Sequence, residues 1–160
     1  MDKELKKKVL PIYEQVGAVV QNSQHMEFAI GFSLTMLKQL QSTMFTDAEF
    51  DGSMDLFSQK TLGRLIREYK KHIDLDNVAI DSLKLTLDER NYVIHRFFNE
   101  NIENMTTPKG RELALNRLRK ARNNIHPGFV ILDSIVKSLM EASGMDVNQI
   151  LNDAESSIEV

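Results

Sequence analysis

Residues 86–98 contain side chains whose types and spacing could perform acid–base chemistry on a phosphate. In the run Thr86-Leu-Asp-Glu-Arg-Asn-Tyr-Val-Ile-His-Arg-Phe-Phe98, the relevant groups are Arg90, Asn91 and His95. The imidazole of a histidine titrates near neutral pH and can therefore accept or donate a proton. The guanidinium of an arginine keeps its charge and grips phosphate through two donors. These three residues are the candidate catalytic group of the chain.

The apolar residues around this group predict that it lies on a helix. At about 100° per residue, five of them form one stripe: Ile80, Leu83, Leu87, Ile94 and Phe98. Arg90, Asn91 and His95 fall on or beside that stripe. The far side of the helix is expected to carry Glu89, Tyr92, Arg96 and Glu100. Burying an unpaired polar group costs about 1 to 3 kcal/mol, so polar side chains at a packing face need partners.

The pattern Arg90-Asn91-x-x-x-His95 resembles the R-x4-6-H signature of the HEPN superfamily, a group of small all-helical domains. Many members are metal-independent ribonucleases of bacterial toxin–antitoxin and phage-defence systems, and a polar residue commonly follows their arginine. In that family, the arginine and histidine of two protomers face each other across a dimer interface and form one RNA-cleaving cleft. The resemblance implies an endoribonuclease toxin or effector that needs no cofactor or metal and uses Arg90, Asn91 and His95 for catalysis.

The resemblance also assigns a role to each residue. His95 would draw the proton from a ribose 2′-hydroxyl, whose oxygen then attacks the adjacent phosphate. Arg90 would stabilise the developing charge, and Asn91 would hold the imidazole or contact the phosphate. An antitoxin protein is a further expected partner. Some HEPN toxins carry a tyrosine two residues after the histidine that a nucleotidyltransferase modifies, but Phe97 stands there in this chain and argues against that route of neutralisation.

The spacing of the motif favours an active site made by two chains. Residues five apart on a helix lie about 140° apart around the axis and about 7.5 Å apart along it. Arg90 and His95 of one chain therefore converge poorly on one phosphate, whereas a twofold axis can bring one chain's arginine beside the other's histidine. We expect a homodimer.

The alternative is a structural role for the same residues. Arg90 would then pair with the carboxylate of Asp88 or Glu89, and His95 would be a core histidine bonded to the backbone. The chain would in that case be a noncatalytic HEPN-like helical module that binds a nucleotide or a protein partner.

Two other Arg–His pairs occur in the chain. Arg67 and His72 have the same spacing, but Arg67 projects away from the apolar side of its helix and is expected to be solvated. His126 follows Arg122 at a spacing one residue shorter and precedes Pro127, so we expect it to be a residue of a helix kink.

Basic residues concentrate in the segment 108–126, although the net charge of the chain is −3. A basic helix can follow a phosphate backbone even in an acidic protein, which predicts RNA binding there. A solvated helix face is the alternative. The predicted RNA-binding residues are Arg111, Arg117, Arg119, Lys120 and Arg122.

Hydrophobic periodicity predicts an all-α fold, an antiparallel bundle of four main helices with short additional helices. A helix of about 30 residues should start at Pro11, and residues 43–57 should form a loop with at most one helical turn. A second helix is expected from about Ser58 to Ile73. Residues 74–77 should then serve as the connector and N-cap of the motif helix, which should run to about Glu103.

The last helical stretch should run from Pro108, with Thr107 as its N-cap, to Ser143. Pro127 is expected to interrupt it, and Gly144 to cap it. A short helix over residues 147–153 would complete a single domain over residues 1–155. Residues 156–160 are expected to follow as a disordered tail.

Composition excludes some other classes of protein. The chain of 160 residues has no cysteine, which excludes disulfides and thiolate metal sites and fits a reducing compartment. Its apolar runs are shorter than the ~18 residues of a membrane span, so we expect a cytoplasmic protein without a membrane partner. His25 and His72 show no metal-ligand spacing, and no metal site is expected.

Overall fold

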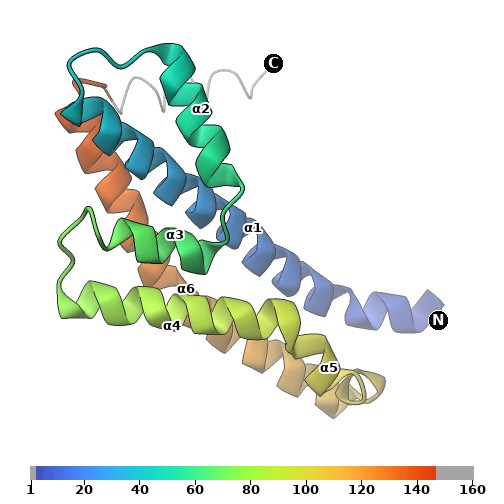
Figure 1. The fold of residues 1–160 in the computed structure, drawn as a ribbon. Coiled ribbons are helices and arrows are strands. Elements are labelled where there is room, and N and C mark those ends of the chain that lie inside the picture. Colours follow the sequence, from blue (N-terminus) through green and yellow to red (C-terminus); the bar gives the residue numbers. More distant parts are fainter. Residues whose placement is uncertain (1–2, 147–160) are drawn as a thin grey trace. The chain divides into compact units, whose positions relative to one another are not determined.

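The computed structural model describes residues 3–146, which form six α-helices and one short 3₁₀ helix, with no strand among these residues (Figure 1). The all-α class expected from the sequence is confirmed, whereas an antiparallel bundle of four main helices stays a prediction. The expected segments 147–153 and 156–160 lie outside the described residues. The elements are α1 (Lys3–Gln41), α2 (Asp47–Ser58), α3 (Leu62–Tyr69), α4 (Asn77–His95), α5 (Phe97–Asn101), η1 (Asn104–Thr106) and α6 (Pro108–Ala142).

The described residues form two compact units. Helices α1 and α6 are shared, since one segment of each belongs to the first unit and the other segment to the second. Residues 3–26 and 74–130 form the first unit, which contains all the candidate site residues. Residues 27–73 and 131–146 belong to the second. The single domain expected over residues 1–155 stays a prediction. The first unit buries side chains from α1, α4, α5 and α6, among them Ile12, Val19, Met26, Leu83, Val93, Phe97, Leu118 and Ile125.

The second unit has its own apolar core. It includes the fully buried side chains of Ile30, Met36, Leu62 and Leu65. Tyr69 is also fully buried, and this burial raises the pKa of its phenol from 10.0 to about 12.

Helix α1 starts eight residues before the proline that was expected to begin it. It runs for 39 residues from Lys3 and passes through Pro11 without ending. A proline inside a helix leaves the carbonyl four residues earlier without its donor. Here Pro11 and Lys7 are both exposed, so water can satisfy that carbonyl. The expected start at Pro11 is therefore wrong, because the proline lies on the solvent side.

Helix α2 occupies most of the segment that was expected to be a loop. Its first turn is closed by a capping box, in which the Glu49 amide donates to Thr46 Oγ1 at 3.3 Å and the Thr46 amide donates to Glu49 Oε2 at 2.8 Å. The backbone hydrogen bond from Thr46 lowers the pKa of Glu49. The loop prediction is wrong because these two hydrogen bonds satisfy backbone and side-chain groups at the helix start.

The motif helix ends earlier than expected. Helix α4 starts after Asp76, whose carboxylate accepts from the Ala79 amide at 2.7 Å, as the expected N-cap region requires. It ends at His95, because Arg96 departs from helical geometry with φ −122° and ψ −28°, and α5 follows. The second expected helix is likewise shorter and covers only Leu62–Tyr69.

Helix α6 is continuous, so the expected interruption at Pro127 is wrong. Pro127 is exposed, so water can satisfy the carbonyl four residues earlier that lacks its amide donor. The next residue, Gly128, is buried and packs closely against α4. A Cβ atom at Gly128 would lie 2.2 Å from Thr86 Oγ1. The expected start at Pro108 is confirmed, and the Gly110 amide donates to Thr107 Oγ1 at 3.0 Å. The helix ends at Ala142, one residue before the expected Ser143, and Gly144 follows with φ +81°.

Candidate functional site

The three candidate catalytic residues lie in the last two turns of α4. Arg90 and Asn91 are half-buried, and Arg90 Nη1 donates to Asn91 Oδ1 at 3.1 Å. His95 is the last residue of the helix and is exposed. Asn91 therefore contacts the guanidinium, and the imidazole faces solvent rather than the core.

Two of the polar residues buried on α4 were not expected at its packing face. Thr86 is fully buried and Glu89 keeps only 11% of its side-chain exposure, whereas both Glu89 and the buried Tyr92 were expected on the far side. That expectation is wrong for these two, and right for Arg96 and Glu100, which are exposed. The apolar stripe misled because α4 also packs against α6 through a side that carries threonine and glutamate.

Glu89 joins α4 to α6 through two polar contacts. Its Oε2 lies 2.7 Å from Arg117 Nη2, and its Oε1 accepts from Asn124 Nδ2 at 2.9 Å. The Arg117 guanidinium also lies 3.9 Å from the centroid of the Tyr92 ring, over which Arg96 lies at 5.4 Å. Sliding one helix past the other would break this partly buried ion pair and leave an uncompensated charge, which costs free energy. The pair therefore favours one register of the two helices.

The five predicted RNA-binding residues fall into two groups. Arg117 is engaged by Glu89, and Arg111 Nη1 donates to the carbonyl of Met105 at 2.9 Å, so both have structural partners. Arg119, Lys120 and Arg122 are exposed. Arg119 Nη1 donates to Asn116 Oδ1 at 3.1 Å and Arg122 Nη1 donates to Gln15 Oε1 at 2.7 Å, and both of these partners are neutral amides.

Two of these exposed arginines line a polar hollow of about 260 Å³. Arg122 and His126 are four residues apart, which puts them on one side of α6, about 40° apart around the axis. His126, expected only as a kink residue, thus lines the same hollow as Arg119 and Arg122. None of the five described residues that line the hollow carries a carboxylate; they are Asn22 of α1 and Arg119, Arg122, Asn123 and His126 of α6.

An apolar hollow of about 240 Å³ lies near the end of the motif. Tyr13 lines it and places its ring 5.4 Å from that of Phe98, three residues after His95. Tyr13 is 47% exposed and Ile102 is 67% exposed. The other lining residues are Leu5, Val9, Met105 and Thr106.

Within residues 3–146, no three His, Asp or Glu side chains gather closely enough to hold a metal ion. The helices of this range also include none that is both long and apolar enough to cross a membrane. A comparison of the chain with models of protein families, with curated proteins and with solved structures found no match.

Proposed function

We propose that this protein is a metal-independent endoribonuclease of the HEPN type, active as a homodimer. The observation that carries the proposal is the Arg90-Asn91-x-x-x-His95 pattern on a single helix, α4, with its histidine exposed at the helix end. A general base for a polymeric substrate must be accessible, and His95 meets that requirement.

The chemistry follows from the two side chains. The His95 imidazole of one chain takes the proton of a ribose 2′-hydroxyl, and the oxygen attacks the neighbouring phosphorus. The bond from phosphorus to the 5′-oxygen breaks, the 5′-oxygen takes a proton from water and leaves as a hydroxyl, and a 2′,3′-cyclic phosphate remains. The Arg90 guanidinium of the second chain stabilises the charge that develops on the phosphate oxygens. The hydrogen bond between Arg90 and Asn91 supports this role, because it orients the guanidinium before RNA binds.

The apolar surface near the motif supports the dimer. Tyr13 and Ile102 expose large apolar side chains around a hollow that a side chain of a second copy could fill. Burying that surface would bring two copies of α4 and α5 close together around a twofold axis.

The exposed cations of α6 support RNA as the substrate. Arg119, Lys120 and Arg122 present charges that no carboxylate of the described residues pairs with. Their phosphate contacts would steer and hold the chain, while the catalytic pair acts on one linkage.

A role as a toxin or effector of a bacterial toxin–antitoxin or phage-defence system belongs to the same proposal. The protein would then act in the cytoplasm and would be neutralised by an antitoxin partner.

The test is cleavage of mixed cellular RNA by the purified chain in EDTA. We expect cleavage by the wild type, and a loss of at least about a hundredfold in rate for Arg90→Ala and for His95→Ala. Both variants should stay folded, because His95 is exposed and neither residue is part of the apolar core. A wild type inert on all RNA, or folded variants that cleave normally, would refute the proposal.

One observation favours a second candidate function, a noncatalytic module that binds a nucleotide. The polar hollow around Arg122 and His126 offers cationic and amide donors to a phosphate without needing a second chain. Nucleotide binding by a wild type that cleaves no RNA would favour this candidate.

A further inference from the structure

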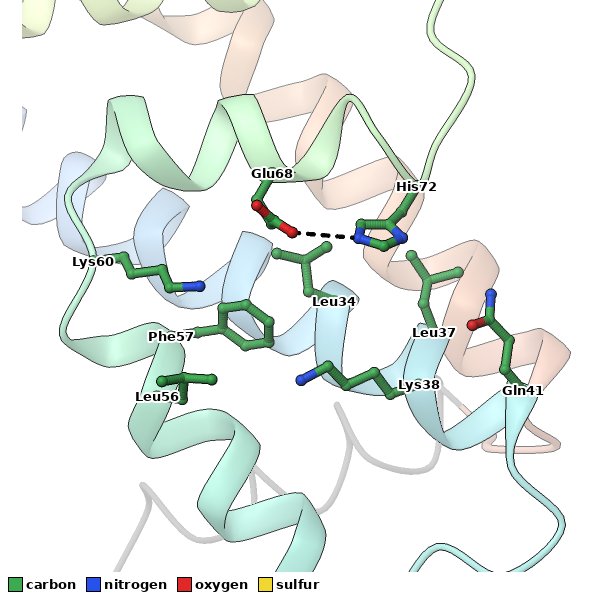
Figure 2. Close-up of a pocket in the computed structure, with 9 residues that line it drawn as sticks. All are labelled: Leu34, Leu37, Lys38, Gln41, Leu56, Phe57, Lys60, Glu68 and His72. Carbon is green, nitrogen blue, oxygen red and sulfur yellow. Dashed lines mark ion pairs between the residues drawn. The ribbon is translucent and has the colours of Figure 1, made fainter.

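A separate pocket lies within the second unit, between α1, α2 and α3 (Figure 2). Its volume is about 200 Å³. Leu34 and Phe57 supply a buried apolar wall, and Leu37 and Leu56 extend it toward solvent. A surface of this kind accommodates a small apolar group.

Two lysines bring their charges to this apolar wall. Lys38 Nζ lies 4.8 Å and Lys60 Nζ lies 4.6 Å from the centroid of the same Phe57 ring. Figure 2 shows the two ammonium groups flanking the ring, with both side chains directed into the pocket. Phe57 is itself held in place by α1, because its Cβ lies 3.1 Å from where a Cβ on Gly31 would be.

Neither ammonium group forms an ion pair with a residue in the described part of the chain. Lys38 Nζ donates to the neutral hydroxyl of Ser53 at 3.0 Å. Two like charges around one ring repel each other, and the ring face compensates each only in part.

The one carboxylate of the pocket is already engaged. Glu68 accepts from Lys71 Nζ at 3.1 Å and lies 3.5 Å from His72 Nε2. The hydrogen bond from Lys71 is the main cause that lowers the pKa of Glu68, with a smaller effect from the more distant Lys60. The pocket therefore offers two ammonium groups to a ligand.

We infer that this pocket binds a small carboxylate with an apolar body. The apolar part contacts Leu34, Leu56 and the Phe57 ring, and the carboxylate lies between Lys38 and Lys60. The inference is independent of the proposed ribonuclease, since the catalytic residues belong to the first unit.

The experiment compares three probes that share one ring: benzoate, benzyl alcohol and benzylamine. Titrated into the full-length wild type and followed by backbone amide NMR, benzoate should shift the amides around Phe57. It should bind at least about tenfold more tightly than benzyl alcohol, and benzylamine should not bind. Equal binding of benzoate and benzyl alcohol, or no benzoate binding at millimolar concentration, would show that the lysines only pack on Phe57.

Two variants keep the stems of the lysines and remove their charges. Lys38→Met and Lys60→Met should each weaken benzoate binding several-fold, and the double variant at least about tenfold, with benzyl alcohol unaffected. Lys84→Met, at an exposed position of α4 in the first unit, is the matched control and should change nothing. Unchanged benzoate affinity in a folded double variant would overturn the inference. Should that variant unfold, the three-probe series on the wild type decides alone.

Discussion

Helices α4 and α6 each carry an arginine, an asparagine and a histidine in that order, but the histidine follows at a different spacing in each helix. In α4, Arg90 and Asn91 precede His95 by five and four residues; in α6, Arg122 and Asn123 precede His126 by four and three. The extra residue in α4 turns its histidine about 100° further around the axis. The α6 pair therefore lines one hollow, while the α4 pair diverges.

The difference shows what each group can do within one chain. Arg122 and His126 line a single hollow, because they share one side of the helix. Arg90 and His95 converge poorly on one phosphate, since five residues separate them by about 140° around the axis and about 7.5 Å along it. One added residue thus separates a pair that shares one side of its helix from a pair that diverges, and the proposed function assigns a second chain to the diverging pair.

Mixing two inactive variants is the strongest way to break this comparison. Arg90→Ala and His95→Ala should each be inactive, yet their equimolar mixture should recover about a quarter of the wild-type cleavage rate, because half of randomly paired dimers are mixed and each has one intact centre of two. The measurement is the RNA cleavage rate after subunit exchange. No recovery would place both groups in one chain, or show that both centres are needed.

Substituting Gly128 tests the packing of α4 on α6, on which both groups depend. Gly128→Ala should lower the free energy of unfolding by about 2 kcal/mol, since the new methyl overlaps the short, branched side chain of Thr86. Gly17→Ala is the matched control on α1. It meets no atom within 4 Å and should raise the stability by up to about 1 kcal/mol. Urea unfolding of both variants measures the difference, and equal stabilities would contradict the close approach.

Breaking the ion pair between Glu89 and Arg117 tests whether Arg117 is a structural residue or one of the proposed RNA-binding residues. Glu89→Gln should lower the free energy of unfolding by about 2 kcal/mol, less than for a fully buried pair because Arg117 retains 31% of its side-chain exposure. A double-mutant cycle with Arg117→Gln should give a coupling energy of about 1 kcal/mol. A coupling energy near zero would show that Arg117 has no structural role in this ion pair, and Arg117 would then rejoin the candidate RNA-binding residues.

The smallest expected effect concerns the α6 group. Replacing Arg119 and Arg122 together by glutamine should weaken RNA binding about tenfold and flatten the salt dependence, by about 0.7 in slope for each lost phosphate contact. Fluorescence anisotropy with a labelled single-stranded RNA at several salt concentrations measures both. Arg67→Gln, an exposed arginine on α3, should have no effect. An unchanged slope in the double variant would leave α6 as a solvated face.

The sequence by itself determined the all-α class and several helix ends, because their signals are local. Asp76, Thr107 and Gly144 act on the backbone within a few residues, so their types and spacing suffice to predict them. The capping box at Thr46 and Glu49 was an equally local signal for α2. Pro11 and Pro127 misled, since a proline ends a helix less readily where water reaches the backbone.

Only the tertiary structure decided which side of α4 is buried and which arginines are engaged. Glu89 and Thr86 have no apolar character that predicts burial, and they are buried because Gly128 lets α6 approach and Asn124 and Arg117 supply partners. Arg117 and Arg122 look alike in sequence, yet one meets a carboxylate and the other an amide. Such partners come from distant parts of the chain, and no periodicity within one helix specifies them.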